Sequence, residues 1–201
     1  GIYANVRDNY LKNAVLAKPT YLTNYEGGNY KLNEGGRPGG DYSEMRGGIT
    51  WSWKWGSLGL VKDHVEWGYN HNGATIFNGK TPSFAMIKLN ANPAPWFDFN
   101  YFHAWLVSMV VDSSRSYTTQ NGDFRAVYQN KYLAANMFTF RPWKHLHISL
   151  GNSIIYSDMN IHPAYLIPCM FYKSIDQTLN KGIDNQNSQM FVSIHSRSIR
   201  N

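Results

Sequence analysis

The sequence predicts an all-β fold built from antiparallel hairpins, and three observations support this prediction. Apolar and polar side chains alternate with a period of two along much of the chain, whereas helical periodicity is weak. Aromatic residues make up 15% of the chain and charged residues only 16%, against roughly 25% charged in an ordinary soluble domain. Short turns alternate with long polar loops, which is typical of antiparallel barrels.

The first hairpin is predicted over residues 49–67. Four apolar residues alternate with polar ones and therefore share one face of a strand. They are Ile49, Trp51, Trp53 and Trp55. Gly56 offers a tight turn, and residues 57–67 form the returning strand. We expect the three tryptophans to lie on an outer, lipid-facing surface, because their face carries no polar side chain.

A second hairpin is predicted from residue 84 onward. Ala85, Ile87 and Leu89 share one face of its first strand. The Asn-Pro-Ala-Pro sequence at residues 92–95 is predicted to turn the chain. A long strand then runs from 96 to 111, with aromatic residues on alternate positions. The connections that follow these two hairpins, residues 68–82 and 112–128, are long and polar.

The clearest hairpin is predicted over residues 129–156, with its turn at 141–144. Its second strand is apolar on one side and polar on the other for about twelve residues, and a tilted membrane strand needs roughly nine to eleven. We expect one set of side chains to face lipid, namely Leu146, Ile148, Leu150 and Ile154. The alternate set should face inward, namely His145, His147, Ser149 and Ser153.

Residues 160–176 interrupt the alternation. Pro163 and Pro168 lie five residues apart, and proline cannot donate a hydrogen bond to a central strand ladder. This spacing predicts an irregular or short helical segment instead of a strand. We expect it to pack inside a barrel or at its mouth.

Together these features predict an antiparallel β-barrel of the outer-membrane type, with aromatic girdles and a polar interior. We expect one region over residues 1–201, loop-rich over 1–45 and made of hairpins over 46–201. Flexible loops are predicted at 25–29 and 35–40, with a strand or two in the first 23 residues. A soluble β-sandwich is the alternative, and the strand length and the tryptophan-rich face disfavour it.

The residues that could carry chemistry predict no catalytic site, cofactor or metal site. Cys169 is the single cysteine, so no internal disulfide can form. His145 and His147 could share a strand face, but no further ligand is apparent nearby. Asp63, Glu66 and Asp98 could supply a carboxylate pair for glycoside hydrolysis, yet Asp63 and Glu66 point to opposite faces of a strand.

The net charge of +6 comes from scattered lysines and arginines without a dense basic run. This distribution disfavours nucleic acid and suits anionic lipid headgroups or an acidic polysaccharide. Aromatic rings stack on sugar faces, and four loop residues are therefore candidates for polysaccharide contact: Tyr69, Tyr117, Phe124 and Tyr128. Packing within the loops and anchoring at a membrane interface are the commoner uses of such residues.

Several short motifs resemble the capsule-assembly outer-membrane barrels (Wzi-like), including gliding-motility relatives of Bacteroidetes. The motifs occur in the same order over residues 57–192. They are Gly59–Gly68, Pro95–Ser108 followed by Asp112-Ser113, Lys131–Pro142, Gly151–Tyr156, Pro163–Pro168 and Asp184-Asn185. The chain departs from the family at Asn152, where glutamate is usual, and at Asn136, where histidine is frequent, so no family role is carried to these two positions.

The resemblance implies a non-enzymatic protein of the bacterial outer membrane that assembles or attaches surface polysaccharide. Its expected partners are outer-membrane lipid or lipopolysaccharide, the polysaccharide itself and other envelope proteins. The family barrel is larger than this chain can close, so we expect an interior portion of a longer polypeptide. Two alternatives stay open: a barrel component of a transport, secretion or gliding-motility complex, and a soluble secreted β-domain that acts on glycans.

Overall fold

The structure is a computed structural model. It describes residues 1–12, 29–32, 39–68, 74–79, 81, 83–106, 108, 110–158, 160–180 and 187–196. Antiparallel strands make up most of its regular structure, which confirms the predicted all-β class. The chain forms two compact units: residues 1–53 with 58–86, and residues 54–57 with 87–201. None of the described helices is long and apolar enough to cross a membrane.

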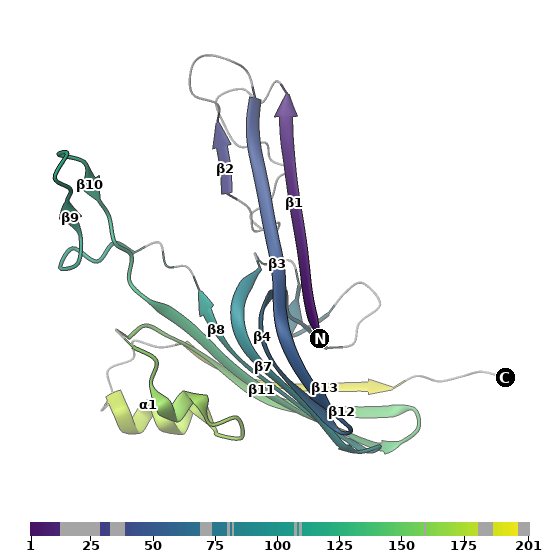
Figure 1. The fold of residues 1–201 in the computed structure, drawn as a ribbon. Coiled ribbons are helices and arrows are strands. Elements are labelled where there is room, and N and C mark those ends of the chain that lie inside the picture. The colour runs from purple at the N-terminus through teal and green to yellow at the C-terminus, as the bar shows by residue number, and fades with distance from the viewer. Residues whose placement is uncertain are drawn as a thin grey trace. The chain divides into compact units, whose positions relative to one another are not determined.

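The first unit is built around one long strand, β3 (Gly39–Trp53), shown in Figure 1. Strand β1 (Ile2–Lys12) pairs with β3 along its whole length, from Ile2 opposite Ile49 to Lys12 opposite Gly39. The short strand β2 (Asn29–Leu32) also pairs with β3. Two predicted loops are therefore shorter than expected, since Asn29 begins β2 and Gly39 begins β3. The rest of these loops lies outside the described residues.

The hairpin predicted at 49–67 differs in detail from its prediction. Strand β3 ends at Trp53 and β4 (Gly56–Asp63) begins at Gly56, so the turn consists of Lys54 and Trp55. Beyond β4 the chain leaves the ladder, and β5 (Glu66–Trp67) pairs with β6 (Phe77–Asn78). The predicted returning strand therefore ends four residues early. Side-chain alternation cannot reveal this break, because it continues across it.

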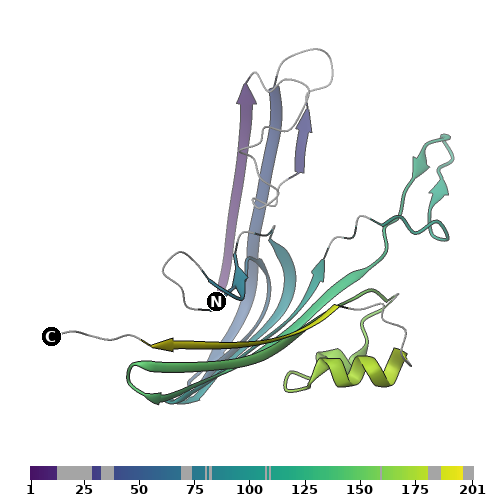
Figure 2. The same cartoon turned by 180° about the vertical axis from the view of Figure 1, so that it is seen from behind.

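The second unit contains most of β7 (Phe84–Ala94), followed in sheet order by four further strands. These are β8 (Phe97–Leu106), β11 (Lys131–Trp143), β12 (Leu146–Tyr156) and β13 (Asn187–Ser196). All neighbouring pairs from β8 to β13 are antiparallel. Figure 2, seen from behind, shows β13 running alongside β12.

The hairpin predicted at 129–156 is confirmed as β11 and β12. Its turn lies at Lys144 and His145, at the end of the predicted range. The pairing register shifts between Phe140 and Trp143, so the strand continues past Pro142 instead of turning there. Gly151 allows a close approach in this hairpin, because a side-chain carbon at this position would lie 2.3 Å from the Asn136 carbonyl oxygen.

Near the short turns, the sheet from β8 to β13 has two chemically distinct faces; we call this part the turn-side half. Cross-strand partners share a face. One row on the apolar face consists of Phe99, Phe138, Leu150 and Val192, and the next of Phe97, Phe140, Ile148 and Ile194. The row between them lies on the polar face and consists of Asp98, Thr139, Ser149 and Ser193.

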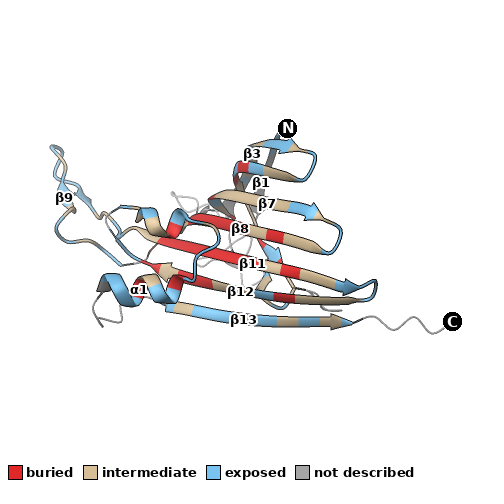
Figure 3. Cartoon of the chain, turned by 90° about the horizontal axis from the view of Figure 1, so that it is seen from below, coloured by how far each residue is buried: buried red, intermediate tan, exposed pale blue. Residues whose placement is uncertain are grey.

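Farther from the short turns, the apolar face is covered by a separate segment, residues 161–180, which we call the covering segment. It contains a 3-10 turn (Pro163–Leu166) and α1 (Tyr172–Asn180), which confirms the irregular or helical structure predicted there. Figure 3 shows α1 lying across the ends of the strands in this loop-side half of the sheet. Tyr165 and Tyr172 of the segment belong to one buried cluster with Tyr156 and Ile154.

The burial of Ile154 corrects one sequence-based prediction. Ile154 was expected to face lipid with Leu150, but it is fully buried in the cluster that the covering segment closes. The segment thus lies on the face that was assigned to lipid. A place inside a barrel, one of the two expected for the segment, and lipid on that face therefore exclude each other; the other place, at the mouth of a barrel, stays a prediction. Alternation identifies a shared face but not what covers it.

Candidate functional site

The connection between β8 and β11 carries a small two-stranded ribbon. Strand β9 (Tyr117–Thr118) pairs with β10 (Phe124–Arg125), with Thr118 opposite Phe124 and Tyr117 opposite Arg125. The Thr119 amide donates to the Asp123 carbonyl at 2.8 Å, which closes the tip. Gly122 adopts a φ of +88° in this turn, a backbone conformation that favours glycine. We call residues 112–128 the ribbon loop.

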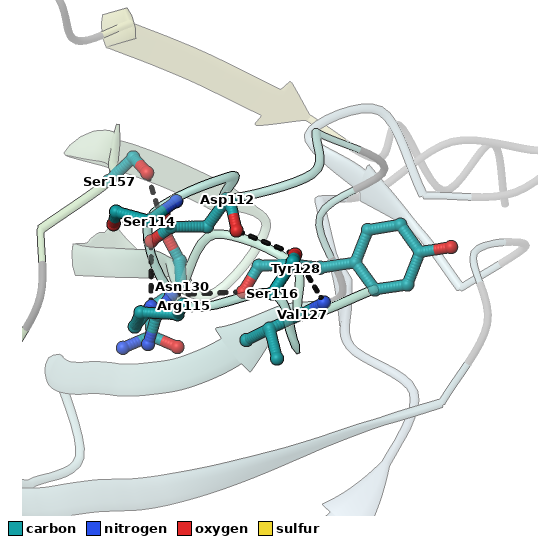
Figure 4. A network of polar contacts seen from close by, with 8 residues as sticks. All are labelled: Asp112, Ser114, Arg115, Ser116, Val127, Tyr128, Asn130 and Ser157. Carbon is teal, nitrogen blue, oxygen red and sulfur yellow. Dashed lines mark hydrogen bonds and ion pairs between the residues drawn. The ribbon is translucent and has the colours of Figure 1, made fainter. Parts of the chain in front are cut away.

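Asp112 organises the base of the ribbon loop, as Figure 4 shows. Its carboxylate accepts hydrogen bonds from the Ser114 hydroxyl at 2.6 Å, the Ser114 amide at 3.0 Å and Arg115 Nε at 2.6 Å. The hydrogen bonds from Ser114, followed by that from Arg115, lower the pKa of Asp112 to about 2. The carboxylate therefore stays ionised at neutral pH.

Two further side chains connect the outgoing and returning arms of the loop. Arg115 Nη2 donates to the Tyr128 carbonyl at 3.0 Å. The Ser116 hydroxyl donates to the Asp112 carbonyl at 2.7 Å and accepts from the Val127 amide at 3.0 Å (Figure 4). The bonds from Arg115 to Tyr128 and from Val127 to Ser116 join the two arms, so the ribbon extends from an ordered base.

The ribbon loop exposes three of the four aromatic residues proposed from the sequence. Tyr117, Phe124 and Tyr128 are all at least half exposed, Phe124 most of all at 69%. Tyr69 lies outside the described residues. The strand register places Tyr117 and Phe124 on opposite sides of the ribbon, so the structure does not bring the candidates into a single aromatic platform.

Sequence reasoning missed Arg125, which is exposed and lies directly opposite Tyr117 across the ribbon. An aromatic ring beside a guanidinium can stack on a sugar and also pair with a carboxylate or phosphate on it. The alternation of residues 117–118 and 124–125 around a glycine-containing turn was a usable signal for this pairing.

A polar recess of about 350 Å³ lies at the turn-side end of the second unit. Its polar lining comes from Lys54, Ser57, Asn90, Asn92, Asp98 and Asn100, with Trp55 beside them. Asp98 is not a free carboxylate, because it pairs with Arg141 and accepts a hydrogen bond from Asn92. Arg141 also donates to the Pro95 carbonyl at 3.2 Å. These contacts give Asp98 a structural role.

The structure also places Asp63 and His145, two further candidates from the sequence. Asp63 accepts a hydrogen bond from the Tyr3 hydroxyl at 2.9 Å and lies 3.5 Å from Arg46. His145 lies in the β11–β12 turn, so the expected strand face shared with His147 is wrong. Within the described ranges, no three His, Cys, Asp or Glu residues are grouped to hold a metal ion.

Asn136 and Asn152, the two departures from the family pattern, fasten the covering segment to the sheet. The Asn136 amide group donates to the carbonyls of Pro168 and Met170, both at 2.9 Å. Its oxygen accepts from Asn152 Nδ2 at 2.8 Å, and Asn152 in turn accepts from the Tyr172 amide at 3.1 Å. The pair therefore satisfies backbone groups that the two prolines leave outside regular structure.

No family model, curated protein or solved structure matches this chain. The likeness to capsule-assembly barrels therefore rests on the short motifs and on their order in the sequence.

Proposed function

We propose that this chain forms part of the wall of an outer-membrane β-barrel that attaches or assembles surface polysaccharide without catalysing a reaction. The observation that carries this proposal is the separation of the two faces in the turn-side half of the sheet. The rows through Leu150 and Ile148 are wholly apolar, while the row through Thr139 is wholly polar. This alternation is the pattern of a strand with lipid on one side and water on the other.

The exposed side chains on the apolar face support a lipid environment. Val192 is 66% exposed and Ile194 is 69% exposed, and Leu150 beside them is also exposed. A contiguous apolar surface is unfavourable in water and marks a membrane or protein contact. The opposite face carries the Asp98–Arg141 pair, which would be costly to place in hydrocarbon.

Exposed tryptophans support the same orientation. Trp96 lies in the β7–β8 turn and Trp143 next to the β11–β12 turn, and both are mostly exposed. Tryptophan is enriched where a membrane meets water. These residues suit the girdle at the short-turn side of the wall, and the ribbon loop then extends from the opposite ends of the strands.

We assign polysaccharide contact to the ribbon loop, where Tyr117 and Arg125 share one side and Phe124 occupies the other. This arrangement suits an acidic sugar chain that passes the ribbon, with rings stacking on sugars and the guanidinium pairing with an acidic group. The ordered base at Asp112 limits the entropy lost on binding. A transport or secretion role would use the same loop for an envelope protein instead.

Membrane placement is tested by fractionation of cells that produce the protein. We expect it to stay in the outer-membrane pellet after alkaline carbonate washing, and release by carbonate would contradict the proposal and favour the soluble alternative.

Polysaccharide contact is tested by binding of the purified capsule of the producing strain to the Phe124→Ala variant. We expect a several-fold loss of affinity, whereas the control Lys144→Ala, in the β11–β12 turn at the opposite ends of the strands, should bind as the original protein does.

A further inference from the structure

The covering segment lies on the apolar side of the sheet. Its Tyr165 ring stacks near Tyr156 with ring centroids 4.4 Å apart, and its Tyr165 carbonyl accepts from the Tyr101 hydroxyl at 3.0 Å. Tyr156 follows Leu150 on β12 by an even number of residues, so both side chains point to one face. The segment therefore covers the continuation of the apolar rows, opposite the Asp98–Thr139–Ser149 row.

The outward surface of the segment is apolar over residues 166–171. Leu166, Ile167, Met170 and Phe171 are exposed although they are large hydrophobic residues. Tyr165 and Tyr172 turn the other way and are fully buried. The segment is thus apolar on both sides over residues 165–172, which is unfavourable for a surface that faces water. The exposed side of α1 beyond it carries Lys173, Ser174, Gln177 and Thr178.

The charges of the segment favour an anionic surface as its neighbour. Lys173 is exposed at the first turn of α1, whereas Asp176 is buried. A cation next to exposed apolar side chains is typical of segments that lie at the interface of a membrane, where the cation meets lipid headgroups. Charge complementarity therefore favours anionic lipid over an acidic protein surface.

Two backbone carbonyls of the segment are hydrogen-bonded by a side chain of the sheet, which suits an environment with little water. Irregular backbone near hydrocarbon is tolerated only where protein groups satisfy its polar atoms. Asn136 supplies such bonds to the carbonyls of Pro168 and Met170, directly beside the exposed apolar residues. A loop bathed in water would not require a fully buried asparagine for this purpose.

We propose that the covering segment is an external interfacial element: it lies on the lipid side of the wall, with Leu166, Ile167 and Phe171 among the acyl chains of an anionic lipid layer. Lys173 contacts the headgroups of that layer. This inference rests on the membrane placement proposed above. It differs from the expectation that the segment packs inside a barrel or at its mouth.

The single cysteine of the chain provides the test, because Cys169 is exposed within the segment. The protein is labelled there with an environment-sensitive fluorophore and inserted into phosphatidylethanolamine–phosphatidylglycerol vesicles. Quenching by brominated acyl chains is compared with quenching by aqueous iodide. In a Cys169→Ala background, Val192→Cys reports the apolar face and the adjacent Ser193→Cys reports the polar face.

We expect the Cys169 label to behave as the Val192→Cys label does, with several-fold stronger quenching by brominated lipid than the Ser193→Cys label shows. If Cys169 instead follows Ser193→Cys while Val192→Cys is quenched by lipid, the segment lies in the lumen; the inference is overturned and the membrane placement stands. If Val192→Cys and Ser193→Cys are both quenched by iodide alone, both proposals are overturned.

The headgroup contact has its own test in the Lys173→Glu variant, with Lys144→Glu in the β11–β12 turn as the matched control. We expect Lys173→Glu to reduce lipid quenching of the Cys169 label in phosphatidylglycerol vesicles to the level seen in phosphatidylcholine vesicles. Lys144→Glu should leave this quenching unchanged. Equal quenching of the original protein in the two kinds of vesicle would overturn the anionic-lipid assignment.

Discussion

The two halves of the sheet from β8 to β13 obey the same alternation but differ in chemistry. In the turn-side half, the apolar rows contain no polar side chain. In the loop-side half, the same face carries His103 and Asn136, both fully buried. His103 meets the Tyr156 hydroxyl at 2.7 Å, and Asn136 bonds to the covering segment. The two buried polar side chains His103 and Asn136 thus lie where neighbouring protein groups supply hydrogen-bond partners.

The comparison separates two kinds of burial. A face covered by folded protein accepts polar side chains, because fixed donors and acceptors satisfy them. A face covered by lipid accepts none, because hydrocarbon offers no partner and an unpaired polar group costs roughly 2–7 kcal/mol. The uniform rows at Leu150 and Ile148 therefore suit lipid, and the mixed rows at Asn136 suit a protein cover.

The largest effect is expected from a charge on the apolar face of the turn-side half. Ile148→Arg should lower the free energy of unfolding by about 2–4 kcal/mol if the site lies near the bilayer midplane. His147→Arg, one residue away on the polar face, should leave the free energy of unfolding nearly unchanged. Urea unfolding in lipid vesicles measures both variants. An equal loss for the two would contradict the assignment of the faces.

The next effect is expected in the loop-side half. Asn136→Ala removes two bonds to the covering segment and two to Asn152, and takes from the Pro168 carbonyl its partner on the sheet, so we expect a loss of about 2–3 kcal/mol. Limited proteolysis should then cut within residues 161–180 before the strands. Asn100→Ala, on the opposite face, should leave this segment as resistant as before. Intact resistance in Asn136→Ala would show that the segment is held by its tyrosines alone.

How far the sequence predicts this structure depends on which feature is considered. The hairpin of β11 and β12 follows from alternation, because the pattern continues in register from Tyr132 to Phe140 and from Ile148 to Tyr156, with Asn136 and Asn152 as its exceptions. The burial of Ile154 does not follow from alternation. An apolar residue covered by Tyr165 occupies the same position in the alternating pattern as an apolar residue covered by lipid. The ribbon partners Tyr117 and Arg125 depend on a turn at Gly122; the glycine signals the turn, but two-residue strands are too short for alternation to fix which residues pair.

A smaller effect is expected from the polar row of the turn-side half. The Thr139 and Ser149 hydroxyls are buried and lie 2.9 Å apart. Thr139→Val removes one partner and leaves the other unpaired, so we expect a loss of about 1 kcal/mol. Thermal unfolding of this variant and of the double variant with Ser149→Ala measures the pair. The double variant should recover part of the loss, and a strictly additive loss would mean that the two hydroxyls act independently.

The smallest effect is expected from the pH dependence of the contribution that Asp112 makes to the stability of the ribbon loop. Because the pKa of Asp112 is lower in the folded loop than in the unfolded chain, its stabilising contribution is complete above the ordinary value of about 4. The contribution falls as the pH decreases and is lost as the pH passes about 2. We expect the amide resonances of Ser114 and Arg115 to keep their positions down to about pH 3, by the same argument. In Asp112→Asn they should be shifted at every pH.

The central claim is that the turn-side half of the sheet is a membrane wall, and a nitroxide scan along β13 in lipid vesicles tests it most directly. Single labels are placed in turn at residues 189–195 in a Cys169→Ala background. If the turn-side half is a membrane wall, the accessibility of the labels should alternate with a period of two along β13. Labels at 190, 192 and 194 should collide mainly with oxygen dissolved in the bilayer, and labels at 189, 191, 193 and 195 mainly with a water-soluble nickel chelate. Similar access of the nickel chelate to both sets would contradict the claim.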